Sequence, residues 1–267
     1  MADPGALIVI GGHEDKTGER AILKEVAARV HGGRLVIATL ASHEPEGYFE
    51  GYQKAFADLG VTDLVELYVQ NRAEARSPEK LALLDGAAGV FFSGGDQLRL
   101  ASQIGDTPLE RRVRQMHRSG AVLAGTSAGA SAMGGIMMVR GASRETHRIG
   151  DLQMAAGLAL LPGLIIDQHF AERGRIGRLL GAVAHNPRLL GVGVDENTAM
   201  VVEGSGFRVV GAGGVYVADA GEVSWVNVAE AVRQEALAIH DVKLHVLSAG
   251  DRFDFDARRP TPGSPTQ

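Results

Sequence analysis

Short apolar runs alternate with longer amphipathic stretches through the first half of the chain, and this alternation limits the possible folds more than any other feature. The runs are apolar throughout, which is typical of parallel strands that are buried on both faces. The predicted strands are Leu7–Ile10, Arg34–Leu40, Leu64–Val69, Gly89–Phe92 and Ala121–Ala124, and the predicted helices are Gly18–Val30, Pro45–Leu59, Pro78–Gly86 and Pro108–Arg118. Strands that alternate with helices form parallel βαβ units. We therefore expect an α/β fold with a doubly wound, mainly parallel sheet that helices cover on both faces.

The second half of the chain has a different pattern, in which short apolar runs follow one another closely and are joined by glycine-rich turns. The predicted strands are Gly163–Ile166, Leu189–Val194, Ala199–Val202, Phe207–Val210, Val215–Val217 and Val242–Leu247, and the predicted helices are Arg175–His185 and Glu230–Ile239. We expect the closely spaced strands to form a short antiparallel addition at one edge of the sheet. No linker or repeat divides the chain, so residues 1–257 are expected to form one domain. The proline-rich residues 258–267 are expected to be a frayed tail.

Composition excludes several classes of function. The 267 residues carry a net charge of −5, which argues against a nucleic-acid-binding protein that relies on a basic surface. Cysteine is absent, so the chain has no disulfide, no thiolate metal site and no cysteine nucleophile. The apolar stretches are too short to span a membrane, and residues 1–5 lack the basic start of a signal peptide. We expect a cytoplasmic enzyme without nucleic-acid or membrane partners.

The segment Gly125–Gly129 has the pattern G-x-S-x-G, with Ser127 at its centre, and it directly follows a predicted strand. A strand that turns sharply into a helix holds such a serine exposed in a nucleophile elbow. The flanking glycines suit the turn, because the backbones approach too closely for a Cβ. The pattern also arises by chance in a glycine-rich chain, so it predicts a serine hydrolase only together with a base and an acid.

Two further strands end in polar residues that supply candidates for the base and the acid. His169 follows the strand that ends near Ile166, and Asp195 and Glu196 follow the strand that ends at Val194. Active sites of α/β proteins lie at the carboxyl ends of parallel strands. Either acid can accept a hydrogen bond from the histidine, but successive strand residues face opposite ways, so only one is expected to do so. Solvated side chains at strand ends are the alternative interpretation.

An oxyanion hole requires two converging backbone donors. One is expected to be the N–H of Ala128, and the other to come from the turn Ser93–Gln97, where Gly95 lets the main chain approach a substrate. An ordinary strand-to-helix turn is the alternative. The segment 13–15 also follows a strand and carries a histidine and two acids. Adjacent ligands seldom converge on one ion, so we expect this segment to line the cleft and predict no metal or cofactor.

Three arginines, Arg173, Arg175 and Arg178, follow the candidate base. Arg175 and Arg178 are three residues apart and share a face of the predicted helix. Such a cluster either solvates the helix or clamps a substrate carboxylate, which a guanidinium binds through two parallel hydrogen bonds. The residues alone leave both interpretations open.

Together these segments resemble the cyanophycinases, a family of serine peptidases that also includes peptidase E, the aspartyl dipeptidase. The resemblance covers almost the whole chain in the family's order. It rests on Ile10–Lys16, Phe92–Gln97, Gly125–Ala130, Asp167–Phe170, the three arginines, Asp195–Ala199 and Gly250–Phe253. Each segment is a weak signal alone, and their combination is highly specific.

The resemblance implies a flavodoxin-like fold, remotely similar to the class I glutamine amidotransferases. It implies Ser127 as the nucleophile, His169 as the base and Glu196, instead of Asp195, as the acid. The residues that it implies for substrate binding are Gln97, Asp167, Gln168, Arg173, Arg175 and Arg178. His13 departs from the family's pattern, because a small residue is expected at its position.

The family's substrate is cyanophycin, a poly-aspartate backbone that carries an arginine on each side-chain carboxyl. The resemblance implies hydrolysis of this backbone through an acyl-enzyme, release of β-Asp-Arg dipeptides, no cofactor and a homodimer. The arginine α-carboxylate of the polymer suits a guanidinium clamp, and its guanidinium suits a carboxylate such as Asp167.

Three alternatives compete with this interpretation. An α/β-hydrolase esterase has its triad in the order serine, acid, histidine, whereas the candidates here follow the order serine, histidine, acid. An aspartyl or isoaspartyl dipeptidase of the peptidase E type prefers short free peptides and has no need for the arginine pair. A non-catalytic binding protein could share the same fold, although it has little reason to keep all three candidate residues.

Overall fold

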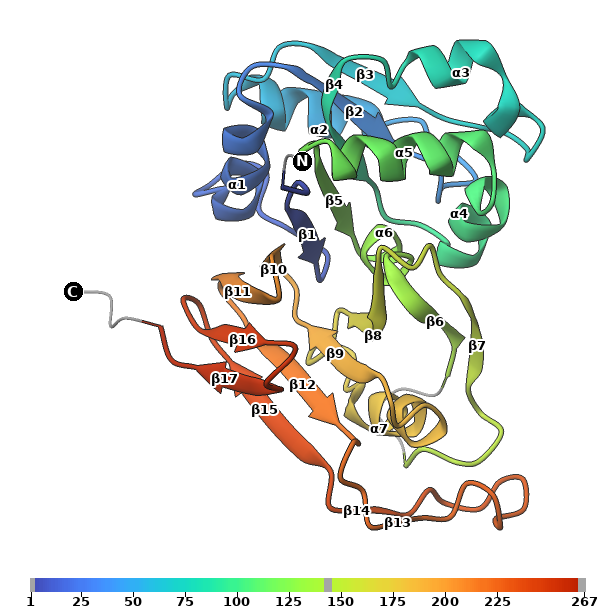
Figure 1. Ribbon diagram of the computed structural model, residues 1–267. Coiled ribbons are helices and arrows are strands. Elements are labelled where there is room, and N and C mark those ends of the chain that lie inside the picture. The colour runs from blue at the N-terminus through green and yellow to red at the C-terminus, as the bar shows by residue number, and fades with distance from the viewer. Residues whose placement is uncertain (1–2, 142–145, 264–267) are drawn as a thin grey trace.

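The computed structural model describes residues 3–141 and 146–263. Within these residues the chain forms two large sheets (Figure 1). The first has the order β17-β16-β11-β10-β1-β5-β4-β2-β3. Its parallel part consists of β1 (Leu7–Ile10), β2 (Arg34–Ala38), β3 (Leu64–Leu67), β4 (Ala87–Phe92) and β5 (Val122–Thr126). The predicted α/β class with a parallel sheet is therefore confirmed.

Helices cover both faces of this parallel part. They are α1 (Ala21–Val30), α2 (Tyr48–Ala57), α3 (Pro78–Ala82), α4 (Gln97–Ile104) and α5 (Pro108–Arg118), with a 3-10 turn, η1, at Glu74–Arg76. Residues of β1 alternate between two cores: Leu7 and Val9 pack with α4 and α5, and Ile8 and Ile10 pack with α1 and α2. Because both faces are buried, the strand is apolar at every position.

Local sequence explains where the helices of one face begin. The side chain of Thr107 accepts a hydrogen bond from the backbone N–H of Glu110, and Pro108 occupies the first position of α5. Asp96 caps α4 in the same way by accepting from the N–H groups of Leu98 and Arg99. Helix α4 was not among the predicted helices, although it begins at Gln97, the last residue of the turn Ser93–Gln97.

The antiparallel part of the first sheet is larger than the short edge addition that we expected. It consists of β10 (Thr198–Glu203), β11 (Gly206–Gly211), β16 (Arg252–Asp254) and β17 (Arg259–Thr261). Residues 258–267 were expected to be a frayed tail. Instead, β17 pairs with β16 over Arg259–Thr261. Its backbone N–H and C=O groups form hydrogen bonds to β16 at this edge of the sheet, which holds the segment in place. Residues 264–267 lie outside the described residues.

The second sheet is mixed and has the order β15-β12-β9-β8-β6-β7. Its strands are β6 (Gly134–Arg140), β7 (Gln153–Ala156), β8 (Leu161–Gln168), β9 (Leu190–Val194), β12 (Val215–Asp219) and β15 (Lys243–Leu247). One of its faces shares a core with the first sheet, and α7 (Ile176–His185) packs against the other. The short helix α6 (Ala128–Ser131) connects β5 to β6, between the green and yellow parts of Figure 1.

The predicted helix Glu230–Ile239 is wrong. This segment lies in a loop closed by β13 (Trp225–Val226) and β14 (Ile239–His240). The side chain of Asn227 donates to the carbonyl of Ala236 and accepts from the N–H of Ala238, which stabilises the loop instead of a helix. None of the residues 230–239 is fully buried, so a helix here would have no apolar face to pack.

Across the described part of the chain, no helix combines the length and the hydrophobicity that crossing a membrane requires.

Candidate active site

Ser127 occupies a sharp turn between β5 and α6, at the carboxyl end of the parallel strands. Its backbone has φ 53° and ψ −112°, and its N–H donates to the carbonyl of Ile10 at 3.0 Å. Small residues are required around it. A Cβ on Gly125 would lie 2.6 Å from the carbonyl oxygen of Gly129, and one on Gly129 would lie 2.4 Å from that of Phe92. The predicted strand–turn–helix context of the G-x-S-x-G segment is therefore present.

His169 lies directly after β8 and faces the serine. Its Nε2 lies 2.9 Å from Oγ of Ser127. The backbone of His169 is left-handed, with φ 47°, and its N–H donates to the carbonyl of Gly11 at 2.8 Å. The imidazole packs on Gly12, where a Cβ would lie only 2.3 Å from Cε1 of the ring. The loop after β1 therefore fixes both the backbone and the ring of this histidine.

Glu196 lies on the other side of the imidazole. Its Oε1 accepts from Nδ1 of His169 at 2.7 Å, so the second ring nitrogen, Nε2, presents its lone pair to Ser127. Asp195 points elsewhere, since its two oxygens accept the N–H groups of Ala171 and Gly214, each at 2.9 Å. Of the two acids that the residues alone left open, the structure brings Glu196 to the histidine.

The electrostatic surroundings of His169 favour its neutral form. Burial of the ring has the largest effect and lowers the pKa of His169 below its usual value of 6.5. The hydrogen bond and the charge of Glu196 raise this pKa, whereas Arg173 and His13 lower it. At neutral pH the imidazole can therefore accept a proton from the serine.

A pocket of about 540 Å³ opens beside Ser127. It is lined by His13, Glu14, Lys16, Tyr48, Tyr52, Gly94, Gly95, Thr126, Ser127 and His169. Gly94 borders the serine, because a Cβ on it would lie 3.5 Å from Cβ of Ser127. Gly95 has φ 138° and approaches the backbone of Ala41 too closely for any side chain. The glycine turn therefore borders Ser127 through Gly94, and the roles of Gly95 and Ala128 in an oxyanion hole stay predictions.

Residues 13–15 were expected to line the cleft, and His13 and Glu14 do line this pocket. Glu14 is buried, and its Oε1 accepts from the hydroxyl of Tyr52 at 2.5 Å and from Nζ of Lys16 at 3.0 Å. Its Oε2 accepts from Oγ1 of Thr126 at 2.6 Å. Burial, followed by the charge of Glu14, raises the pKa of Tyr52 well above 10. Tyr52 and Thr126 lie far from Glu14 in the sequence, so no local pattern reveals these two hydrogen bonds.

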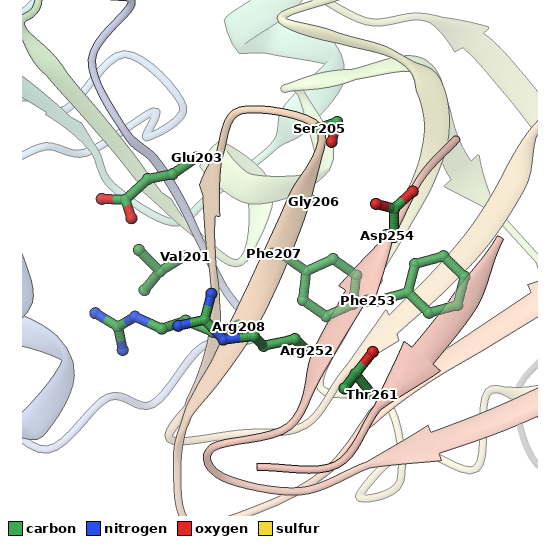
Figure 2. A pocket seen from close by; sticks show the side chains of 10 residues that line it. All are labelled: Val201, Glu203, Ser205, Gly206, Phe207, Arg208, Arg252, Phe253, Asp254 and Thr261. Carbon is green, nitrogen blue, oxygen red and sulfur yellow. The ribbon is translucent and has the colours of Figure 1, made fainter. Parts of the chain in front are cut away.

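Another hollow, of about 280 Å³, lies between β10, β11 and β16 at the end of β10 that is remote from Ser127 (Figure 2). Glu203 and Arg208 line it, and both belong to an ion-pair network with α1. Arg29 contacts Glu203 at 2.6 Å, and Glu25 contacts Arg29 and Arg208 at 2.5 Å each. These charges neutralise one another, so the Ser127 pocket is the better candidate for an active site.

Comparison with known proteins supports this choice. The model of peptidase family S51 matches residues 7–210. The chain belongs to peptidase family S51. It is a serine peptidase, as the resemblance noted in the sequence implied.

Relatives of this S51 peptidase share sequence over almost its whole length. It is 41% identical to a cyanophycinase of Trichormus variabilis over 98% of this chain and 89% of the relative. It is 40% identical to a cyanophycinase of Synechococcus elongatus, covering 94% of this chain and 79% of the relative. A cyanophycinase of Geminocystis herdmanii is 37% identical, with 97% of this chain and 96% of the relative covered.

Solved structures extend the similarity of the fold. A peptidase from an acI-B1 Actinobacterium has a TM-score of 0.67 and 24% identity, covering 95% of this chain and 98% of that one. A putative peptidase E protein from Listeria monocytogenes EGD-e has a TM-score of 0.54 and 14% identity, covering 78% of this chain and 99% of that one. At these identities the likeness concerns the fold, and it agrees with the predicted flavodoxin-like class.

The predicted substrate-binding residues of this S51 peptidase fall into two groups. In the first, Asp167 and Gln168 contact two buried arginines. Nε of Arg178 donates to Asp167 at 2.7 Å, and Nη2 also contacts it. Nη1 of Arg175 donates to Asp167 at 3.0 Å and to Oε1 of Gln168 at 2.8 Å. Burial lowers the pKa of Arg175 to about 10, and Asp167 opposes this effect.

The second group consists of Gln97 and Arg173. Gln97, at the start of α4, donates through Nε2 to the carbonyl of Met138 at 2.7 Å. Arg173 is exposed in the loop before α7, and its charge acts on His169. Asp167 accepts from two arginines of the protein, so a contact with a substrate guanidinium would have to compete with them. The roles of all six residues toward a substrate stay predictions.

Proposed function

We propose that this S51 peptidase is a serine-type exopeptidase that hydrolyses the poly-aspartate backbone of cyanophycin and releases β-Asp-Arg dipeptides. The observation that carries the proposal is the hydrogen-bonded series of Ser127, His169 and Glu196, with 2.9 Å and 2.7 Å between successive members. The substrate class is supported by relatives named cyanophycinase, which are 37–41% identical over most of their length.

The first half of the proposed reaction is acylation. His169 takes the hydroxyl proton of Ser127 at Nε2 while Oγ attacks a backbone carbonyl carbon of the polymer. Glu196 holds the imidazole in the correct tautomer and stabilises the imidazolium that forms. The N–H groups of Ala128 and Gly95 are proposed to bind the oxyanion, and loss of one such donor typically costs ~3 kcal/mol.

The first half ends when His169 gives its proton to the leaving amine, the peptide C–N bond breaks and the amine product departs, which leaves the acyl-enzyme. The second half is deacylation. The neutral imidazole then takes a proton from a water molecule, which attacks the acyl-enzyme and restores the serine hydroxyl. The low pKa of His169 suits this cycle, because the base form is the major form at neutral pH.

The arginines and their neighbours are proposed to recognise the substrate. Each unit of the polymer offers an arginine α-carboxylate, for which a guanidinium is a suitable partner. Arg173 is exposed, and Nε of Arg175 is buried without an acceptor among the described residues. We propose that both donate to the substrate, with Gln97 and Gln168 nearby, and that a substrate carboxylate relieves the unpaired donor.

The decisive experiment compares the protein with two serine variants on a cyanophycin suspension. The parent protein and Ser131→Ala are expected to clear the suspension and release β-Asp-Arg, detected by mass spectrometry. Ser127→Ala is expected to do neither. Ser131 is a matched control, because it lies four residues away on α6 and donates to the carbonyl of Ile166 instead of His169.

Each other outcome favours a different function. Absence of clearing by the parent protein contradicts the proposal. Cleavage of free aspartyl or isoaspartyl dipeptides in preference to the polymer favours the peptidase E alternative. Failure of a fluorophosphonate to label Ser127 in the folded protein favours a non-catalytic relative.

A cytoplasmic location and a homodimer are also proposed. The location follows from the composition of the chain, and the homodimer follows from the family resemblance. Light scattering of the purified protein measures its mass against the 28.1 kDa of one chain. A mass of one chain contradicts the dimer.

A further inference from the structure

His13 brings a second imidazole to the proposed active site. Its Nδ1 lies 3.5 Å from Oε2 of Glu196, the oxygen that His169 does not use. The ring of His13 meets that of His169 edge-on, with 5.1 Å between centroids and 88° between planes. One ligand atom from each of His13, His169 and Glu196 lies within 4.8 Å of the others. Two imidazoles and a carboxylate therefore lie close enough together to share one ion after a small adjustment.

This arrangement has the dimensions and the chemistry of a zinc site. Zinc ligands at 2.0–2.2 Å in a tetrahedral site lie roughly 3.3 Å apart, close to the 3.5 Å between His13 and Glu196. Imidazole nitrogens with one carboxylate oxygen suit zinc, whereas magnesium and calcium prefer oxygen ligands alone. Three protein ligands leave a fourth position for water, as in accessible zinc sites.

The ion has a path to the site. The side chain of His13 is 71% exposed, that of Glu196 27%, and that of His169 only 5%. An ion from solvent first meets His13 and Oε2 of Glu196 at the rim of the pocket. To reach Nδ1 of His169, it has to widen the 2.7 Å contact between that nitrogen and Oε1 to roughly the 3.3 Å that separates zinc ligands. The exposed His13 ring can adjust to complete the site.

We propose that a divalent zinc-class ion binds His13, His169 and Glu196 and reversibly inhibits this peptidase. This inference rests on the proposed roles of Ser127 and His169. The ion takes the lone pair of Nδ1 of neutral His169, and the single ring proton moves to Nε2 by exchange with water. Nε2 then donates to Oγ of Ser127 and can no longer accept its proton. Glu196 contacts the ion instead of the imidazole N–H, so both partners of the serine are lost.

His13 lies outside the proposed series of Ser127, His169 and Glu196, so replacing it tests the ion site alone. His13→Ala removes one of three protein ligands and leaves the other two. His13→Gln keeps a polar side chain of similar reach without an imidazole. For each protein, the rate of Ser127 labelling with zinc is divided by the rate without zinc, so any effect of the substitution on the zinc-free rate cancels.

Zinc binding is measured first, by titrating ZnCl₂ into the protein in a calorimeter. The wild type is expected to bind one ion, and His13→Ala and His13→Gln to bind it at least tenfold more weakly. MgCl₂ at the same concentrations is expected to give no binding. Absence of zinc binding by the wild type, or equal binding by the variants, overturns the proposed site.

Inhibition is measured as the rate at which a fluorophosphonate labels Ser127, since this probe carries no substrate carboxylates that chelate zinc. At a zinc concentration that saturates the wild type, its labelling is expected to fall at least tenfold and to recover with EDTA. At the same zinc concentration the labelling rate of His13→Ala is expected to fall less than twofold. Equal loss in both proteins overturns the inference. A wild type that is unlabelled even without zinc contradicts the proposed function, whereas the calorimetry still decides whether the ion binds.

Discussion

Replacing Gly12 with alanine tests whether the loop after β1 positions the proposed base. A Cβ at this position would lie 2.3 Å from Cε1 and 2.7 Å from Nε2 of His169, and ordinary contact begins at 3.4 Å. The ring and the loop must therefore separate by about 1.1 Å. The loop cannot easily move, because Gly11 accepts from the N–H of His169 and Gly12 accepts from that of Asn197, each at 2.8 Å.

The ring is therefore the part that moves. A misplacement of about 1 Å in a reacting group costs on the order of 100-fold in rate, so we expect kcat to fall about 100-fold in Gly12→Ala. Gly12 has φ +106°, so alanine there also destabilises the fold, by roughly 1–2 kcal/mol for a left-handed residue. Gly32→Ala is the control, because Gly32 has φ +75° but no atom within 4 Å of its Cβ position.

The assay is single-turnover labelling of Ser127 together with release of β-Asp-Arg from cyanophycin. Thermal melting of both variants measures the backbone strain separately. Gly32→Ala is expected to lower the melting temperature and keep its activity. If Gly12→Ala retains activity within threefold of Gly32→Ala, the reasoning that the loop positions the imidazole is refuted.

Three further substitutions test the charges around the site. Glu196→Gln is expected to lower kcat about 10⁴-fold by permitting the wrong imidazole tautomer, and a loss below tenfold would count against the proposed acid. The proposed mechanism requires neutral His169, whose pKa is lowered, so the acid limb of kcat/KM is expected below pH 6.5. Arg173→Gln removes a positive charge that lowers the pKa of His169, so the acid limb is expected to shift to higher pH. Arg173→Lys keeps the charge and should leave the acid limb in place. Asp167→Asn leaves two buried guanidinium groups without a counter-charge, so the free energy of unfolding in urea is expected to fall by about 3–5 kcal/mol. The exposed control Asp85→Asn, which loses only a surface pair, is expected to cost less than about 1 kcal/mol, and equal effects would contradict the buried-pair argument.

The parallel half of the fold could be predicted because its signal is local. Strand β1 is apolar at all four positions, since Leu7 and Val9 face one core and Ile8 and Ile10 the other. Strands were also predicted at β8, β9, β12 and β15, but that they form a second sheet together with β6 and β7 could not be predicted. Its strands β6 and β7 follow the small residues after Ser127, which have no strand-like alternation, and their pairing is decided by tertiary contacts.

Sequence alone limited the candidate acid to two residues but could not choose between them. The choice depends on which carboxylate the backbone aims at His169, and Asp195 is held away by N–H groups from two other loops. Glu14 had no local signal, because its partners Tyr52 and Thr126 are 38 and 112 residues away. Side chains that act through distant partners become visible only in the folded chain.

The loops after β1, β8 and β9 are tied together through Gly11, Gly12, Asp15 and Asn197, and this has a consequence for how the peptidase is made. The N–H of Asp15 donates to the side chain of Asn197 across 182 residues of sequence. His169 follows Ser127 by 42 residues, and Glu196 follows His169 by a further 27. A chain still leaving the ribosome thus exposes the proposed nucleophile before the proposed base and acid have been synthesised. On this reasoning, hydrolysis begins only after the loop that follows β9 has packed against the loops that follow β1 and β8, so hydrolytic activity indicates that the whole chain has folded.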